Sequence, residues 1–417
     1  MEKYQITGSQ PLTGEIRVAG AKNAALKILA ASILSDKICR VSNIPKIEDI
    51  KRMAEILEDL GVKMAWGNST MEIDPAGLKK SSPDWELTKK LRSSIMLAGP
   101  LLARFGEVTM SQPGGCIIGQ RPIDLFLAGF KTLGAELFEH NESFTLKAKK
   151  LKGAKIVLPK ISVTVTESLM MTACLAEGLT TIINAAMEPE IPALADYLNN
   201  CGAKIKGAGT PWITIEGVDR LSAGEYELIP DRIEAGSFIM LGLATNSQIK
   251  VSNCRPEHLE TVLAILKNAG ANLEIGPDYI ATKPSFLRGT EIQTHEYPGF
   301  PTDLQAPFTV LMTQAKGRSL IHETIFEGRL FYTDKLTLMG ADIIMCDPHR
   351  VIVEGGTKLR GKKLESPDLR AGMALIIAGL CAEGETIIDN IYQIERGYAQ
   401  VVPRLKNIGA KIEKISG

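Results

Sequence analysis

Six amphipathic helical patterns divide the chain, and a glycine follows each of them. The patterns cover residues 47–60, 123–133, 191–201, 259–269, 330–339 and 398–408. The glycines are Gly61, Gly134, Gly202, Gly270, Gly340 and Gly409, at intervals of 68 to 73 residues. A glycine one step beyond a helix is a C-cap, because glycine enters the left-handed region without strain. The spacing therefore predicts one unit of about 70 residues, repeated along the whole chain.

A second, more apolar helical pattern precedes each amphipathic one. These patterns start near Lys22, Arg92, Thr166, Glu234, Asp303 and Arg370. A helix that is apolar on most sides is buried, and none of these reaches the roughly 18 uninterrupted apolar residues of a membrane span. Short strands follow, so each unit is expected to run strand-helix-strand-helix-strand-strand. Buried helices with strands outside them predict an inverted α/β architecture, in which sheets wrap a helical core.

The length supports two domains of about 200 residues, with three units in each. We place the first domain at residues 22–229 and the second at residues 1–21 together with 230–417. The N-terminal segment holds two short strands without a preceding helix, so it would complete the last unit. The chain is then expected to cross between the domains twice.

Charge and cysteine content limit the function classes. Lys plus Arg and Asp plus Glu both number 48, so the net charge is zero. This balance argues against a broad surface for nucleic acid or membrane binding. The N-terminus carries no apolar signal core, and the seven cysteines form no Cys-x-x-Cys pair. Both observations indicate a cytoplasmic protein with free thiols.

Charged residues interrupt the apolar patterns where both kinds of helix are expected to start. They are Lys22, Arg92, Arg232, Asp303 and Arg370 at the buried helices, and Arg121, Arg329 and Arg396 at the amphipathic ones. A cation is unfavourable at a helix N-terminus, where the dipole is positive. Each cation could pair with an Asp or Glu. An anionic ligand with several phosphate or carboxylate groups would explain all of them together.

Cys116 lies in a glycine-rich loop directly before the helix that Arg121 and Pro122 open. A thiol beside a cation and a helix N-terminus has a lowered pKa and is reactive. The alternative is a small buried hydrophobe, but a glycine-rich loop is a poor place to bury a side chain. We therefore expect a functional thiol at Cys116 and structural roles for the other six cysteines.

Two further helix starts carry candidate chemistry. Asp303 follows Tyr297-Pro-Gly-Phe-Pro-Thr and suits a helix N-cap, a general base, or both. Lys22 and Asn23 open the first buried helix, where Asn23 could be a plain cap. The phosphate-binding loop, the dinucleotide fingerprint and the zinc-protease spacing are all missing from the sequence. No metal and no cofactor are therefore implied.

With these residues in place, the chain resembles the enolpyruvyl transferases from end to end. The resemblance is carried by GAKNAAL, PGGCIIGQRPIDL, PDRIEAG, YPGFPTDLQA, TIFEGRL, DLRAGMALIIAGL and ERGYAQ. The cysteine loop and the run after it are similar to the branch that acts on UDP-N-acetylglucosamine. The resemblance implies two inside-out α/β barrel domains of three repeats each, with the active site in the cleft between them.

That branch moves the enolpyruvyl group of phosphoenolpyruvate to the 3-hydroxyl of UDP-N-acetylglucosamine, releasing phosphate through a tetrahedral intermediate. It is the first committed step of peptidoglycan synthesis. The resemblance implies catalytic roles for Cys116, Asp303, Lys22 and Arg396. Cys116 would be the general acid and the thiol alkylated by fosfomycin, and Asp303 would contact the 3-hydroxyl.

The resemblance also implies a set of substrate ligands. Lys22, Arg121 and Arg396 would clamp phosphoenolpyruvate, with Arg92, Arg329 and Arg370 nearby and Asn23 on the sugar. The nucleotide would be lined by Arg121, Pro122, Ile123, Asp124, Leu125, Lys160, Ser162, Val163 and Ile325.

Some positions depart from the family pattern. Phe126 stands where His is common, Thr164 stands where Gly is usual, and Gly328 precedes Arg329 where Asn is typical. We expect the first two to affect nucleotide affinity and not the reaction type. Two alternatives stay open: the shikimate-pathway enolpyruvyl transferase, which lacks the loop thiol, and a catalytically weak paralogue that binds UDP-sugars. The sequence does not divide the acid and base roles among Cys116, Lys22 and Asp303.

Overall fold

The structure, a computed structural model, describes residues 2–111 and 122–416. The third repeat shows the predicted unit in full: β9 (Lys155–Val157), α6 (Val163–Ala173), β10 (Leu179–Ile183), α7 (Glu190–Asn200), β11 (Lys204–Lys206) and β12 (Trp212–Glu216). β9 and β10 are parallel and the other pairs are antiparallel, in the sheet order β11-β12-β10-β9. The strand-helix-strand-helix-strand-strand unit is therefore confirmed.

The first two repeats follow the same plan, except that the second has no leading strand among the described residues, so its sheet has three strands where the other five sheets have four. The first has α1 (Lys22–Ser32), β3 (Cys39–Ser42), α2 (Glu48–Asp59), β4 (Lys63–Trp66) and β5 (Thr70–Asp74). Two short helices, η1 (Pro75–Gly77) and α3 (Trp85–Lys90), lead to the second repeat. Its buried helix starts as a 3₁₀ turn, and the repeat comprises η2 (Arg92–Leu97), α4 (Ala98–Phe105), β6 (Glu107–Ser111), α5 (Asp124–Thr132), β7 (Glu136–Glu139) and β8 (Ser143–Lys147).

The last three repeats are equally regular. The fourth has α8 (Arg232–Ala244), β14 (Gln248–Ser252), η3 (Pro256–Leu259), α9 (Glu260–Asn268), β15 (Asn272–Ile275) and β16 (Tyr279–Lys283). The fifth has β17 (Glu291–Gln293), η4 (Thr302–Leu304), α10 (Gln305–Gln314), β18 (Arg318–His322), α11 (Thr333–Leu338), β19 (Asp342–Asp347) and β20 (Arg350–Glu354). The sixth has β21 (Lys363–Glu365), α12 (Leu369–Cys381), β22 (Glu385–Asp389), α13 (Tyr392–Glu395), α14 (Val401–Lys406) and β23 (Lys411–Ser416).

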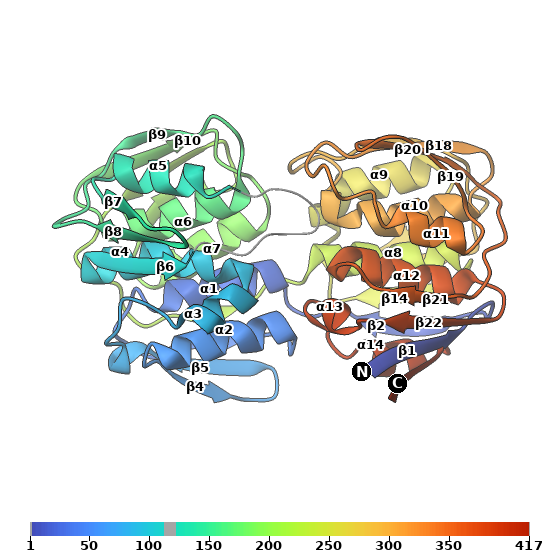
Figure 1. Ribbon diagram of the computed structural model, residues 1–417, viewed down its shortest axis with the longest axis horizontal. Helices are drawn as coiled ribbons and strands as arrows, with labels where there is room; N and C mark the ends of the chain where they lie inside the picture. Colours follow the sequence, from blue (N-terminus) through green and yellow to red (C-terminus); the bar gives the residue numbers. More distant parts are fainter. Residues whose placement is uncertain (1, 112–121, 417) are drawn as a thin grey trace. The chain divides into compact units, whose positions relative to one another are not determined.

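Three strands complete sheets far away in the sequence. β1 (Glu2–Thr7) pairs with β22 and β23, so the N-terminal segment completes the last repeat, and Figure 1 shows the two chain ends side by side. β2 (Thr13–Arg17) pairs with β14, and β13 (Glu225–Glu227) pairs with β3. The described chain divides into two compact units, one of residues 20–111 and 122–229 and the other of residues 2–19 and 230–416. The chain therefore passes from one unit to the other at residues 19–20 and 229–230.

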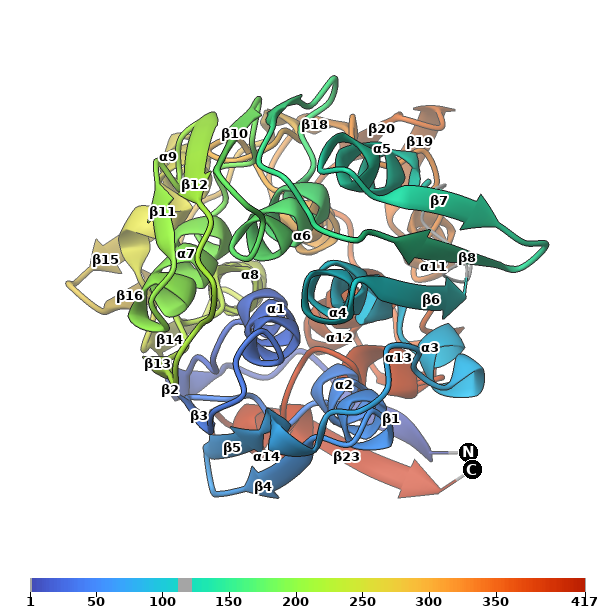
Figure 2. The ribbon, with the colours of Figure 1, turned by 90° about the vertical axis from the view of Figure 1, so that its left-hand side faces the viewer.

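The buried helices lie inside each unit and the sheets lie outside. Every residue of α8 except Arg232 is buried, and α12 is buried from Arg370 to Leu380. Figure 2 shows α1, α4 and α6 grouped inside the strands of the first three repeats. The predicted inverted architecture is confirmed. In the described part of the chain, no helix is long and apolar enough to cross a membrane.

The six repeat glycines adopt the predicted backbone conformation. Their φ angles lie between +92° and +100°, a region that side chains with a Cβ rarely enter. The last amphipathic helix departs from expectation, because the segment predicted as one helix at residues 398–408 begins only at Val401. Gln400 has a φ of +48°, so the backbone turns there and separates α14 from the short α13.

The core of the first three repeats contains a buried ion pair. Lys27 Nζ of α1 lies 3.3 Å from Glu167 Oε2 of α6, and neither residue is more than 4% exposed. Burial raises the pKa of Glu167 to about 7, and Glu190 and Glu188 add to the shift while Lys27 opposes it. This carboxyl is therefore expected to titrate near neutral pH.

The stability of the protein should consequently fall with rising pH through Glu167. The unfolded carboxyl releases its proton near 4.5, whereas the folded one holds it up to about 7, so the contribution is complete below 4.5 and lost above 7. The loss is at most about 3 kcal/mol. Glu167→Gln should shrink the difference in unfolding free energy between mildly acidic and mildly alkaline pH, measured by urea denaturation. An unchanged difference would contradict this assignment; Glu177→Gln, at an exposed carboxylate, is the matched control.

Candidate active site

Asp303 lies in η4, the 3₁₀ turn that leads into the buried helix α10. Its neighbour Leu304 packs closely against Gly236 of α8, where a Cβ would lie 2.4 Å from Leu304 Cδ1. Gly236 thus permits the approach of η4 to α8. The tightly packed neighbour holds Asp303 at the start of α10, as the sequence predicted. The predicted N-cap role is wrong, because the turn is capped by Pro301 without a side-chain hydrogen bond.

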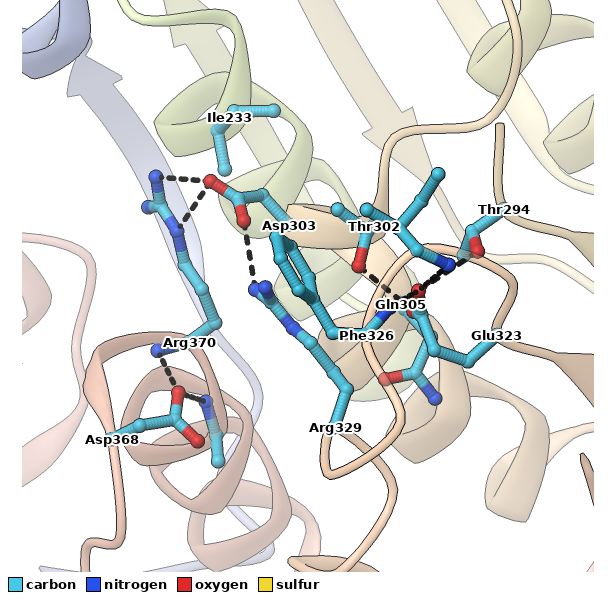
Figure 3. Close-up of polar contacts among 12 residues, drawn as sticks. Ile233, Thr294, Thr302, Asp303, Gln305, Glu323, Phe326, Arg329, Asp368 and Arg370 are labelled. Atoms are coloured by element: carbon cyan, nitrogen blue, oxygen red, sulfur yellow. Dashed lines mark hydrogen bonds and ion pairs between the residues drawn. The ribbon is translucent and has the colours of Figure 1, made fainter. Parts of the chain in front are cut away.

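Asp303 lies between two arginines (Figure 3). Arg329 Nη2 donates to Asp303 Oδ1 at 2.7 Å, and Arg370 donates to Oδ2 from Nε at 3.1 Å and from Nη2 at 2.9 Å. Both guanidinium groups are buried, while the Asp303 side chain is 27% exposed. A carboxylate offers about four acceptor positions. Three are used here, so Asp303 can accept one further hydrogen bond through Oδ1.

The arginines keep Asp303 ionised. Burial by itself would raise the pKa of Asp303, but the charges of Arg370 and Arg329 and their hydrogen bonds lower it far below its ordinary value. A carboxylate with so low a pKa is a weak base. In this state Asp303 is a hydrogen-bond acceptor that orients a donor, and it would remove a proton only from a group made strongly acidic.

Arg370 occupies the second position of α12, close to the positive end of the helix dipole. Asp368 caps this helix by accepting from the backbone N–H groups of Arg370 at 2.8 Å and Ala371 at 3.0 Å. The carboxylates of Asp368 and Asp303 offset the unfavourable position of the cation. Arg329 and Arg370 thus have the acidic partner that an ordinary ion pair requires, and one acceptor position of that partner, Asp303, is left for a further donor.

Glu323 is a site residue that sequence reasoning missed. It is fully buried, and its Oε1 accepts from Thr294 Oγ1 at 3.0 Å and from the backbone N–H groups of Ile325 at 2.9 Å and Phe326 at 3.2 Å. Its Oε2 accepts from Thr302 Oγ1 at 2.8 Å (Figure 3). Glu323 therefore holds the segment of Ile325 and the residue before Asp303 in fixed positions.

The repeat itself carried a signal for Glu323. The residue after the second strand of the unit is Asn43, Asn184, Asn253 or Asn390 in four repeats, with φ between +54° and +61°. Each of these side chains donates from Nδ2 to a backbone carbonyl at 2.7 to 3.0 Å. In the fifth repeat this position is Glu323, directly after β18. Alignment of the repeats would have marked this acidic exception.

Replacing Glu323 by Gln should lower both stability and activity. The amide keeps the shape but places N–H groups where backbone N–H and hydroxyl groups now donate to a carboxylate. Hydrogen bonds to a charged group contribute about 1.5 to 3 kcal/mol, so we expect a loss of about 2 to 3 kcal/mol in unfolding free energy. Chemical denaturation measures it, with the exposed Glu354→Gln as control. Equal stability of the two variants would show that the Glu323 hydrogen bonds do not hold this region.

The predicted phosphoenolpyruvate and sugar residues in the unit of residues 20–111 and 122–229 lie at the starts of two helices, α1 and η2. Lys22, the first residue of α1, is buried and lies 2.7 Å from Asp49 Oδ2. Asn23 is half-buried, and Arg92 is the first residue of η2. The ordinary ion pair weighed for each cation is therefore present at Lys22, which is a buried ammonium at the start of a buried helix.

The predicted nucleotide residues also lie at helix starts. Ile123 precedes α5, whose first residue is Asp124, and Ser162 precedes α6, whose first residue is Val163. Pro122 and Lys160 are exposed, and Leu125 and Ile325 are half-buried. Phe126 is only 6% exposed and belongs to the core, while Thr164 is half-buried. Cys116 and Arg121 lie outside the described residues.

Two sequence expectations need correction. Arg396 does not open the last amphipathic helix but caps the C-terminal end of α13, where Nη1 donates to Gln393 Oε1 at 3.1 Å. Cys346 is exposed on β19, so burial does not account for it, whereas Cys39, Cys174, Cys201 and Cys254 are buried and Cys381 is half-buried. Among the described residues, no group of three or more His, Cys, Asp or Glu side chains could hold a metal ion.

Comparison with known proteins defines the class. The family model described as EPSP synthase (3-phosphoshikimate 1-carboxyvinyltransferase) matches residues 6–405. The fold is shared with the enolpyruvyl transferase NikO from Streptomyces tendae, with a TM-score of 0.91 at 22% identity over 100% of this chain and 99% of that one. An EPSP synthase from Acinetobacter baumannii has a TM-score of 0.76 at 20% identity, and all of both chains is covered.

Two curated relatives narrow the class. The UDP-N-acetylglucosamine 1-carboxyvinyltransferase of Desulforapulum autotrophicum is 44% identical, and that of Halothermothrix orenii is 46% identical. In both cases the match covers 100% of this chain and of the relative. The chain belongs to the enolpyruvyl transferase family, in the branch of these UDP-N-acetylglucosamine 1-carboxyvinyltransferases.

Proposed function

We propose that this protein transfers the enolpyruvyl group of phosphoenolpyruvate to the 3-hydroxyl of UDP-N-acetylglucosamine and releases phosphate. The observation that carries this proposal is the full-length identity of 44% and 46% to two enzymes of that name. The solved EPSP synthase is only 20% identical, so the shikimate-pathway reaction is not favoured. We place the reaction in the cytoplasm, as the first committed step of peptidoglycan synthesis.

The reaction requires two opposite proton movements. In the addition step a proton is delivered to the methylene carbon of phosphoenolpyruvate, and the sugar hydroxyl loses its proton as its oxygen bonds to the adjacent carbon. The resulting tetrahedral intermediate then loses a proton from the new methyl group and expels phosphate. A positioned acid near the methylene carbon and a positioned acceptor near the sugar hydroxyl are therefore needed. We assign these roles to Cys116 and Asp303, and we include Lys22 and Arg396 as further catalytic residues.

The contacts of Asp303 suit one part of this chemistry. Its remaining Oδ1 acceptor position can take one hydrogen bond from the 3-hydroxyl, while Arg329 and Arg370 occupy the other three positions. Because its pKa is held low, Asp303 orients the hydroxyl in the ground state. It receives the proton only when the forming C–O bond makes the hydroxyl oxygen strongly acidic.

Several cations are candidates for binding the anionic donor, phosphoenolpyruvate. We propose that Lys22, Arg92, Arg121 and Arg396 bind the phosphate and carboxylate of phosphoenolpyruvate, since arginine forks match these oxygens. Asn23 would contact the sugar, and the nucleotide would be held by Ile325 and the helix starts around residues 121–125 and 160–163.

Phosphate release from phosphoenolpyruvate tests the proposal. Parallel reactions would contain UDP-N-acetylglucosamine, shikimate 3-phosphate or no acceptor. Release with the nucleotide sugar alone, abolished by fosfomycin, is the expected result. Phosphate release only with shikimate 3-phosphate would show that the protein catalyses the shikimate-pathway reaction instead. Release with neither, together with binding of UDP-N-acetylglucosamine by calorimetry, would replace the proposal by that of a binding paralogue.

A further inference from the structure

Tyr398 contacts Arg370 in two ways. The residue is 1% exposed and lies between α13 and α14. Its hydroxyl oxygen accepts from Arg370 Nη1 at 3.2 Å, and the Arg370 guanidinium lies 5.5 Å from the centre of its ring. A cation over an aromatic face is attracted by the ring, most strongly where water is excluded. Tyr398 therefore holds the side of Arg370 that faces away from Asp303.

The hydrogen bonds at Tyr398 have one direction. Tyr398 Oη lies 3.0 Å from Ser237 Oγ, and Ser237 lies 2.8 Å from the backbone carbonyl of Ile233 in α8. The carbonyl can only accept, so the single Ser237 proton goes there. Tyr398 must then donate to Ser237, because its own oxygen already accepts from a guanidinium that can only donate. The order is Arg370 to Tyr398 to Ser237 to the Ile233 carbonyl.

This series of hydrogen bonds requires that Tyr398 is protonated. Burial raises the pKa of Tyr398, although Arg370 opposes the shift, so the phenol keeps its proton at neutral pH. Hydrogen bonds arranged in one direction polarise and strengthen one another. The series ends at the backbone carbonyl of Ile233, in the first turn of α8, and α8 is held in place because it is buried.

The anchored guanidinium determines how Asp303 is held. Arg370 has Nη1 fixed by Tyr398, so its opposite edge, Nε and Nη2, faces Asp303 Oδ2 with both N–H groups. If Arg370 rotated, Oδ2 would lose one or both of these bonds, and the free acceptor position would no longer be confined to Oδ1. Orientation errors of this kind reduce turnover even when the substrate still binds.

We propose that Tyr398, through Ser237, is a positioning residue that fixes the orientation of Arg370 and thereby of the Asp303 carboxylate. The proposal rests on the function proposed above. It adds to that function a residue that is not among the predicted substrate ligands. Tyr398 belongs to the ERGYAQ motif. Tyr398 acts only through Arg370.

Tyr398→Phe is the direct test, because it removes the hydroxyl and keeps the ring. We expect kcat to fall about tenfold, the effect of one hydrogen bond to a charged group. The KM for UDP-N-acetylglucosamine should change less than about twofold, since Tyr398 is buried and its hydroxyl bonds to Arg370 and Ser237. Ser237→Ala should give a smaller loss of the same kind. The control is Tyr332→Phe, a buried tyrosine of the same unit whose hydroxyl bonds to the neutral Gln305. Wild-type kcat in Tyr398→Phe would overturn the proposal.

A double-mutant cycle separates positioning from a general structural role. In an Arg370→Lys background, Tyr398→Phe should cause no further loss of kcat, because the group it positions is gone. Independent, multiplying losses would show that Tyr398 acts by another route. Turnover of the wild-type protein under the same conditions tests the proposed function by itself, so failure of one proposal is distinguishable from failure of the other.

A stability cycle gives a readout that needs no turnover. The shift in denaturation midpoint caused by Tyr398→Phe should be smaller in an Asp303→Asn background, because the oriented guanidinium then has no carboxylate to hold. Equal shifts in both backgrounds would contradict the coupling. Ser237→Ala, measured in the same two backgrounds, keeps the test available if Tyr398→Phe does not fold.

Discussion

Turnover of the Cys116→Ser variant is expected to fall by about 10²- to 10⁴-fold, the contribution of a positioned general acid. The serine hydroxyl is a far weaker acid than the thiol, so it cannot protonate the methylene carbon of phosphoenolpyruvate at a useful rate. Binding of UDP-N-acetylglucosamine should be retained, because the thiol is not assigned to the nucleotide. Steady-state phosphate release measures the first quantity and calorimetry the second.

The control for this variant is Cys346→Ser, which removes an exposed thiol of β19 and should leave turnover unchanged. Cys116→Asp extends the test, since a carboxyl can also donate a proton. It should remain active and resist fosfomycin, which is expected to alkylate the thiol. Unchanged turnover in Cys116→Ser would exclude the acid role, and inactivation of Cys116→Asp by fosfomycin would contradict the predicted selectivity for a thiol.

Asp303→Asn is expected to lower kcat by about 10²- to 10⁴-fold and to destabilise the protein. The amide cannot receive the proton of the 3-hydroxyl, and it leaves two buried arginines without their shared negative charge. Removing one partner of a buried ion pair costs about 3 to 5 kcal/mol. Because the Asp303 side chain is 27% exposed, we expect about 2 to 3 kcal/mol.

The pH dependence of this destabilisation provides a second check. A carboxylate with a lowered pKa contributes stability above its ordinary value of 3.8, and that contribution is lost as pH falls towards the folded pKa. The difference between wild type and Asp303→Asn should therefore be complete at neutral pH and narrow in acid. Asp347→Asn is the matched control, since Asp347 also pairs with an arginine, Arg350 at 2.6 Å, but that arginine is exposed whereas Arg329 and Arg370 are buried. If Asp303→Asn were as active and as stable as Asp347→Asn, the assignment of Asp303 to the active site would be wrong.

Much of the fold was predictable because it depends on local patterns repeated along the chain. Gly61 and its equivalents terminate helices through a backbone conformation that only glycine enters easily, so a single residue type marked each repeat. The same regularity placed Lys22, Asp303 and Arg370 within one residue of the start of a helix. A predicted helix boundary was wrong where a local turn interrupts the amphipathic pattern, as at Gln400, because amphipathic spacing alone does not reveal a residue in the left-handed conformation.

The repeat, the buried and amphipathic helices, and the charged residues at helix starts could be predicted from local patterns, since each depends on residues near one another in the chain. Which charges meet became known from the three-dimensional structure. Asp303, Arg329 and Arg370 come from different elements of two repeats, and Glu323 and Tyr398 reach them through contacts across many residues. Such pairings depend on how helices pack and which edge of a side chain is free, and the local spacing of residues along the chain does not show either.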